Sequence, residues 1–325
     1  MRFPPGVDAV LTIFAVTCLV FAFQVAIPGD SAEVLTGIRF GTETPSIELV
    51  NKVRSETGLD RPVVERYFAW LRRVAHGDLG KSSVHGRSVL GEIAGNAKPT
   101  VALAMAGMGI TLLGGLGLGC WAAAQGRASV FRRHWLTRWL DLLTHAGSVI
   151  GSSIPVFWMA NILIVLFAVK FRMLPSAGNS TIVALVLPSM AVSAGQMLVT
   201  ARFLRGRLLD VLDESYIRAA RARGFGEARI FLVHALPNAI GALVPLLAVQ
   251  FVQLLEGTVV VETVFSRAGI GRLLVDSVFS RDFPVLQGCL LVFSLLCVCA
   301  SAFGRLIQIS LWPESGTHNA RVTFG

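Results

Sequence analysis

The residues that could carry catalysis in this sequence are scattered and do not form a nucleotide, metal or acyl-transfer motif. The stretch G-D-L-G-K-S at 77–82 resembles the end of a phosphate-binding loop, but such a loop needs a glycine five positions before Gly80, where Ala75 stands. The histidines form no H-E-x-x-H pair, and no G-x-S-x-G elbow occurs. The cysteines lie in apolar stretches without metal-ligand spacing. The sequence therefore predicts no catalytic residue, no metal site and no cofactor in this chain.

The most distinctive polar stretch runs from Glu214 to Pro237 and reads E-S-Y-I-R-A-A-R-A-R-G-F-G-E-A-R-I-F-L-V-H-A-L-P. Apolar and small residues at helical spacing predict a helix that ends near Ala222, where Gly224-Phe225-Gly226 follows. A second short helix is expected over 227–235, ended by Leu236-Pro237. The side chains expected to project from this helix pair are Phe225, Ile230, Phe231, Arg221, Arg223 and Arg229. The composition alone fits a solvated loop as well as a docking surface for a partner.

Polar residues also occur inside apolar stretches. Gln250, Gln253 and Glu256 recur at three-residue spacing in one expected helix, and Ser152-Ser153 interrupt another. Polar groups within a bilayer are costly and usually line a pathway, so we expect these five residues to face one. The alternative for Glu256 is a hydrogen bond between helices that only aids assembly.

The composition places these residues in a membrane protein. The chain has 325 residues, of which 54% are hydrophobic and 15% charged, with a mean hydropathy of +0.66. A soluble protein carries about 25% charged residues. We therefore interpret the net charge of +9 as cytoplasmic arginines that fix topology and meet the lipid bilayer, not as a nucleic-acid surface.

An all-α protein with six transmembrane helices is the simplest interpretation. The predicted spans are 7–27, 100–124, 140–169, 181–203, 239–263 and 285–311. The domain boundaries that follow are a first helix within 1–27, an extracytoplasmic segment at 28–98, a five-helix core at 99–311 with a loop at 204–238, and a cytoplasmic tail at 312–325.

The orientation follows from the short loops. Those at 126–138 and 204–238 hold ten Lys and Arg residues, against five on the opposite side, which predicts that these two loops and both termini are cytoplasmic. The 28–98 segment then lies outside as a small folded cap. It contains one expected amphipathic helix, 63–74, in which Val64, Tyr67, Phe68, Leu71 and Val74 would share a face. Gly115-x-x-x-Gly119 in the second span predicts close helix packing.

The spacing of the polar stretch resembles a family motif. The pattern is Ala219-Ala220, then Gly224 after three residues, then His234-x-Leu236-Pro237 after nine more. It is similar to the EAA motif of ABC-importer permeases, with Arg218 where that family has Glu. The dipeptide/oligopeptide/nickel permeases are the most similar, because blocks such as Pro28-Gly29-Asp30, 174–178 and 281–285 resemble theirs in order over nearly the whole chain. One departure is Ala268, where that family usually has Pro.

This resemblance implies the type I ABC importer permease fold and a "B"-type subunit of the bacterial inner membrane. It implies three kinds of partner: a second, homologous permease subunit, two ABC ATPase subunits that bind ATP and Mg, and a periplasmic solute-binding protein. The residues it assigns to the ATPase-coupling loop are Ala219, Ala220, Arg223, Gly224, Phe225, Gly226, Glu227, Arg229, Ile230, Phe231, His234, Leu236 and Pro237.

The implied cargo is a small peptide or a nickel or other metal chelate (a metallophore). The short turn at 171–180 is more similar to the nickel branch. The chain itself would not be an enzyme, because ATP hydrolysis resides in the partners. A non-conducting membrane scaffold that docks a cytosolic partner is the alternative function, and polar residues inside the spans argue against it.

Overall fold

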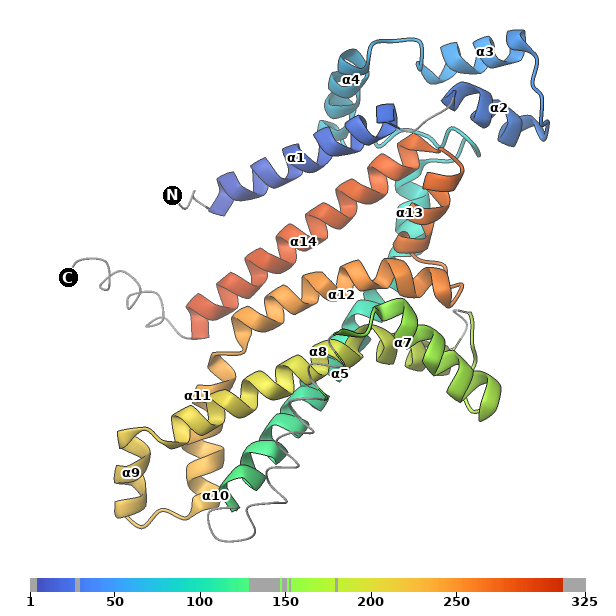
Figure 1. Ribbon diagram of the computed structural model, residues 1–325. Helices are drawn as coiled ribbons and strands as arrows, with labels where there is room; N and C mark the ends of the chain where they lie inside the picture. Colours follow the sequence, from blue (N-terminus) through green and yellow to red (C-terminus); the bar gives the residue numbers. More distant parts are fainter. Residues whose placement is uncertain are drawn as a thin grey trace. The chain divides into compact units, whose positions relative to one another are not determined.

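The computed structural model describes residues 5–26, 30–128, 147, 151, 153–178 and 181–311, and nearly all of them are helical (Figure 1). The described residues form no sheet and contain one isolated bridge, between Lys81 and Ser88. The predicted tail at 312–325, the basic loop from residue 129 onward, most of the first half of the third span, and Ser152 lie outside the described residues.

Four helices in the described part are long and apolar enough to cross a membrane. They are α5 (Val89–Ala128), α8 (Val183–Leu212), α12 (Val244–Val264) and α14 (Phe283–Leu311). The shorter apolar helices are α1 (Pro5–Ala26) and α7 (Val156–Leu163), and α7 continues as a π-helical turn, η1 (Ile164–Lys170). These helices overlap the six predicted spans, but α5 begins eleven residues before its predicted span and α8 ends nine residues after its own. That the chain crosses the membrane six times remains a prediction.

The chain divides into two compact units. The first takes its residues from Met1–Ala102 and Ser266–Val298, and the second from Leu103–Phe265 and Cys299–Gly325. In the first unit, α2 (Ser31–Phe40) and α3 (Ile47–Thr57) begin at side-chain caps from Asp30 and Ser46. Both helices end at glycines in the left-handed conformation, which lets the chain turn back within the small predicted cap.

The amphipathic helix predicted at 63–74 is α4 (Val63–Ala75), but its buried face differs from the predicted one. Tyr67 and Trp70 are buried against Phe21 of α1, whose ring lies 5.1 Å from Tyr67 and 5.6 Å from Trp70. Val64 and Phe68 are exposed, as is Leu71. The helix carries two adjacent apolar stripes, and the packing of α1 decides which of them is buried.

The stretch at 77–82 has a structural role in the first unit. Buried Asp282, just before α14, accepts hydrogen bonds from the Ser82 hydroxyl and from the backbone N–H of Ser83, at 3.0 Å. In another long-range hydrogen bond, the Ile270 N–H, at the start of α13 (Ile270–Phe279), donates to the Thr100 hydroxyl at 2.8 Å. The stretch that resembles a phosphate loop therefore holds a carboxylate of its own chain.

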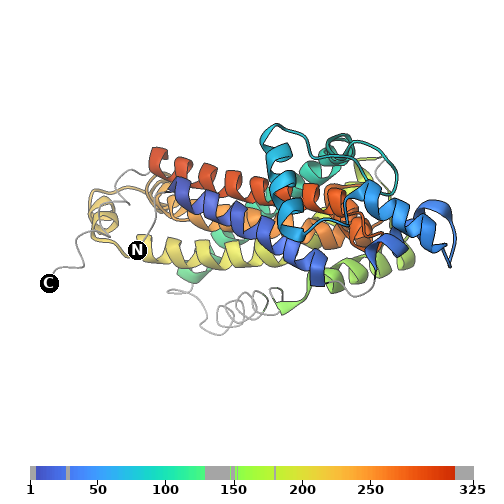
Figure 2. The same cartoon turned by 90° about the horizontal axis from the view of Figure 1, so that it is seen from above.

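In the second unit, α8 packs against both α7 and α12, and α8 and α12 run side by side in both views (Figures 1 and 2). A buried apolar cluster that includes Leu103, Leu187 and Leu254 joins α5, α8 and α12. The predicted glycine packing in α5 is confirmed. A Cβ on Gly115 would lie 2.6 Å from Thr200 Cγ2, and one on Gly119 would lie 2.9 Å from the Ala201 carbonyl oxygen.

Gly119→Val is expected to lower the free energy of unfolding by about 1–3 kcal/mol, because the added carbons would collide with the α8 backbone. The measurement is unfolding by sodium dodecyl sulfate, followed by circular dichroism. Gly117→Val is the matched control, since a Cβ at Gly117 meets nothing within 4 Å. Equal losses in the two variants would contradict close α5–α8 packing at Gly119.

Candidate functional site

The predicted start of the loop at residue 204 is wrong, because α8 continues to Leu212. The rest of the predicted 204–238 loop folds as a short helix pair between α8 and α12. α9 (Ser215–Ala222) is followed by α10 (Glu227–Arg229), the π-helical turn η2 (Ile230–Ala235) and α11 (Leu236–Gly241). The predicted stop at Leu236-Pro237 is wrong, because the helix continues through Pro237 to Gly241. Proline is tolerated there because it lies in the first turn of α11, directly after the wider π turn.

Gly224 makes the turn between α9 and α10. Its φ of +83° is a left-handed value that other residues adopt only with strain. The N–H of Gly224 donates to the Arg221 carbonyl at 2.9 Å, and the N–H of Phe225 donates to the Ala220 carbonyl at 3.3 Å. These two bonds are those of a Schellman C-cap, so the predicted glycine break is confirmed at atomic detail.

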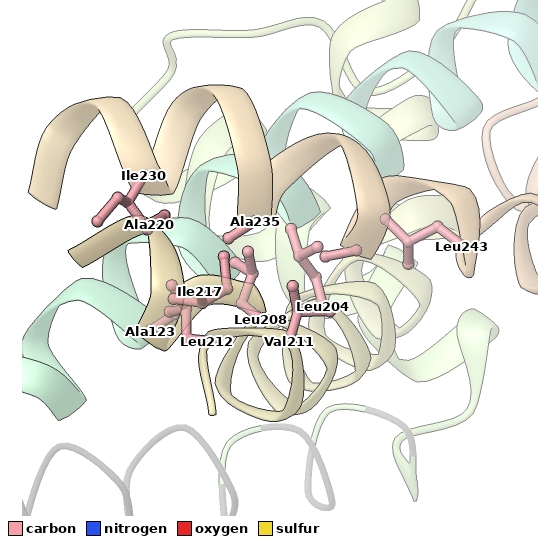
Figure 3. Packing of buried hydrophobic residues seen from close by; sticks show 11 residues of the cluster. Ala123, Leu204, Leu208, Val211, Leu212, Ile217, Ala220, Ile230, Ala235 and Leu243 are labelled. Carbon is pink, nitrogen blue, oxygen red and sulfur yellow. The ribbon is translucent and has the colours of Figure 1, made fainter. Parts of the chain in front are cut away.

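A dry apolar cluster fixes this helix pair to the end of α8 (Figure 3). Its side chains come from five helical segments and point toward one another. Those labelled in Figure 3 are Ala123, Leu204, Leu208, Val211, Leu212, Ile217, Ala220, Ile230, Ala235 and Leu243. Any movement of α9 relative to α8 would expose this cluster, so the loop and the end of α8 form one body.

The prediction that Ile230 projects from the loop is wrong, since it is fully buried in that cluster. Phe225 and Phe231 are half-buried and pack against the cluster's edge. Ile230 points inward because it packs in the same buried cluster as the leucines at the end of α8.

Several charges of the loop are used within it. Arg221 Nε donates to Glu227 Oε1 at 2.7 Å and so joins α9 to α10. The Arg229 guanidinium lies 4.8 Å from the Phe225 ring centroid. The His234 ring stacks on the Phe225 ring, with 6.0 Å between the ring centroids and an interplanar angle of 19°. These contacts hold the turn in one conformation.

The sequence did not predict the hydrogen bonds of Asn238. The Asn238 side-chain amide donates to the Tyr216 hydroxyl at 3.1 Å and to the His234 carbonyl at 2.7 Å. It therefore joins α9 to α11. An asparagine directly after the Leu-Pro pair is the signal that could have identified it.

The surface that α9 leaves open consists of small and basic residues together with the exposed Tyr216. Arg218, Ala219 and Ala222 are exposed on one side of α9, while Ile217 and Ala220 are buried on the other. Of the predicted coupling residues, the exposed ones are Ala219, Arg223, Gly224, Gly226, Glu227, Arg229 and Pro237, and the buried or half-buried ones are Ala220, Phe225, Ile230, Phe231, His234 and Leu236. A partner would meet alanine methyl groups and guanidinium groups there.

The intramembrane amides of α12 divide between two faces. Gln250 is buried, accepts from the Thr200 hydroxyl at 2.9 Å and donates to the Gln196 carbonyl at 3.2 Å. The Gln250 amide therefore joins α12 to α8, and its place along a pathway stays a prediction. At 100° per residue, Gln250 and Glu256 lie about 120° apart around the helix.

The second face of α12 is open. Gln253 and Glu256 are both exposed on it, between Val249 and Val260. Gln253 accepts from the Gln196 side-chain amide at 2.9 Å. A hollow of about 360 Å³, lined in part by these amides, lies beside them. Ser153 is exposed.

Two family models match the sequence. One, described as "Binding-protein-dependent transport system inner membrane component", covers residues 115–311. The other, described as "Binding-prot-dependent transport system membrane comp, N-term", covers residues 5–108. Together they cover both units of the chain.

Similar curated proteins carry the name "Glutathione transport system permease protein GsiC". Those of Escherichia coli K12 and of Shigella flexneri serotype 5b (strain 8401) are each 38% identical over 284 residues, which is 87% of this chain and 88% of the relative.

Two solved structures are similar in fold. An inward-facing structure of the MetNI methionine ABC transporter aligns with a TM-score of 0.57 at 18% identity, over 68% of this chain and 97% of its own. An amino acid ABC transporter with histidines aligns with a TM-score of 0.51 at 19% identity, over 67% and 94%. The described helices therefore have an ABC importer permease fold.

Proposed function

The chain belongs to the family of binding-protein-dependent transport system inner membrane components, and from this premise we propose that it forms half of the path along which small peptides are imported. It is a multi-pass permease subunit of an ABC importer in the inner membrane. It works with ATPase and binding-protein partners, and ATP is hydrolysed in the separate ATPase subunits. The observation that carries the peptide cargo is the 38% identity, over 87% of the chain, to glutathione transport permeases.

The proposed topology has six spans and cytoplasmic termini, with the cap at 28–98 outside. The excess of arginines in the 204–238 loop supports it. A second, homologous permease subunit is proposed to complete the path, because one chain leaves the polar face of α12 open.

A cysteine introduced at Ser46, the exposed N-cap of α3, is expected to react with an impermeant maleimide in intact cells. A cysteine at Ser129 is expected to react only after the cells are opened, because its loop is predicted to be cytoplasmic. Both variants need the native cysteines replaced by serine or alanine first. The reverse labelling pattern would overturn this orientation.

The proposed coupling surface is the open face of α9. A rigid element is required to transmit the movement of an ATPase, and α9 meets that need because its other face is part of the buried cluster with α8 and η2. The exposed alanines allow a partner's groove to approach the helix backbone closely, and the flanking arginines add charge at its rim.

Ala219→Trp should keep the protein folded and in the membrane, because this side chain is exposed, but it should weaken ATPase co-purification by at least about ten-fold. Transport should be lost in parallel. The measurement is the amount of ATPase retained on the affinity-purified permease. Ala75→Trp, the same change at an exposed alanine of α4, is the control. Normal ATPase retention with Ala219→Trp would exclude this face as the docking surface.

The proposed pathway face of α12 consists of Gln253 and Glu256. A carboxylate exposed to lipid would cost about 2.5–3.5 kcal/mol on insertion scales, so its place on an open face favours a polar environment in the assembled importer. A negative charge there would favour a cationic or zwitterionic cargo such as a free peptide amine.

Glu256→Gln is expected to assemble normally with unchanged basal ATPase activity. Its uptake of peptide should fall by about ten-fold, which corresponds to about 1.4 kcal/mol. Uptake of radiolabelled peptide into proteoliposomes measures this. Glu256→Asp keeps the charge and is the matched control. Unchanged uptake of every cargo with Glu256→Gln would show that the carboxylate has no part in the pathway.

A nickel or other metal chelate is the second candidate cargo. The connection between η1, which ends at Lys170, and α8, which begins at Val183, is short, as in the nickel branch that the sequence resembles. Uptake assays with a di- or tripeptide and with a nickel chelate in the same proteoliposomes distinguish the two. A scaffold that conducts nothing would import neither.

A further inference from the structure

A hollow of about 530 Å³ lies in the first unit, beside α4. Its walls are the turn after α3, one side of α4 and the first residues of α14. Four guanidinium groups contribute to the lining, those of Arg61, Arg66, Arg72 and Arg73. Sequence reasoning gave this segment no role beyond that of a cap.

One half-buried cation in this hollow lacks a partner among the described residues. Arg66 is half-buried and has no ion pair with a described carboxylate, and this burial lowers the pKa of its guanidinium. A desolvated cation without a partner is costly, and an anion bound beside it would offset that cost.

The carboxylates of the lining do not neutralise the four arginines. Glu56 is already paired with Arg39, outside the lining, at 3.0 Å. Glu65 is exposed. The hollow therefore keeps an excess of positive charge. Guanidinium groups bind phosphate in a bidentate manner, which makes phosphate the oxyanion that an arginine cluster suits best.

The hollow also lies at the end of two apolar helices. Phe21, in the last turns of α1, lines it, and so do Phe283 and Pro284, the first two residues of α14. The ends of spanning helices meet the membrane at the depth of lipid headgroups, whichever way the chain is oriented. Its volume exceeds that of a single ion and lies within the ~300–1,000 Å³ range of ligand sites.

We propose that this hollow binds the phosphate group of a membrane phospholipid, with Arg66 and Arg73 as donors. The lipid headgroup would then fasten α4 to the ends of α1 and α14. The site shares no residue with the proposed transport path, so the proposal does not depend on the cargo.

The test compares the wild-type chain with Arg66→Gln/Arg73→Gln, both purified in detergent. Dioctanoyl phosphatidylglycerol is titrated into each protein, and the thermal unfolding midpoint is followed. The wild type should be stabilised by several degrees, and the double variant should need at least about ten-fold more lipid for the same rise. Native mass spectrometry should find co-purified phospholipid on the wild type and less on the variant.

Three controls keep the result specific. Lys52→Gln/Arg87→Gln removes the same charge from exposed positions outside the hollow and should bind lipid like the wild type. Trp70→Phe keeps an aromatic ring beside Phe21 and leaves both arginines in place, so it should bind lipid like the wild type. Inorganic phosphate should stabilise the wild type far less than the lipid does.

Three results would overturn the proposal. One is equal stabilisation of all variants by the lipid, which would indicate general charge attraction. Another is equal stabilisation of the wild type by inorganic phosphate, which would indicate a free-anion site. The third is the absence of lipid stabilisation in a wild-type protein that elutes as a single folded species.

Discussion

The packing of α9 onto the end of α8 is the interaction on which the proposed function depends. Ile217 and Ala220 from α9 and Ile230 from η2 are buried among the leucines of α8. Burial of a side chain of this size is worth about 1.5–3 kcal/mol, so the cluster as a whole strongly opposes separation of the loop from the helix. The Gly224 cap and the Arg221–Glu227 pair add directional restraints at the turn. A force applied to α9 would thus reach α8 without being lost in a flexible connection.

Within the membrane, apolar burial gives helices no comparable reason to associate, because lipid tails are as apolar as the side chains. Contacts of other kinds hold α8 at the centre of the second unit. Gly115 and Gly119 let α5 approach the α8 backbone, and Gln250 forms hydrogen bonds with Thr200 and with the Gln196 carbonyl. Because each of these contacts ends on α8, this one helix holds both of its neighbours in register.

Patterns of spacing predicted the elements better than they predicted which side chains those elements bury. The glycine break at Gly224, the bounds of α4 and the close packing at Gly119 follow from local rules that tertiary structure left intact. The burial of Ile230 depends on the leucines of α8, a separate helix, and the residues of the loop alone do not indicate that contact. Trp70 and Gln250 depend on neighbours far along the chain, Phe21 and Thr200, and no single-sequence pattern pairs such distant residues.

The division of α12 into two faces shows how the coupling loop and the proposed pathway are connected. One face is fixed to α8 by the Gln250 amide, and the other carries Gln253 and Glu256 in the open. Leu243, at the N-cap of α12, belongs to the cluster beneath α9, and Glu256 lies 13 residues further on. At 1.5 Å per residue, about 20 Å of helix separates them. Displacement of α9 would move the start of α12 together with α8, and a rigid helix would carry that displacement to the carboxylate. In the proposed mechanism, the amide contacts between α8 and α12 make the two helices move together when the ATPases displace α9, so the pathway face of α12 moves with them.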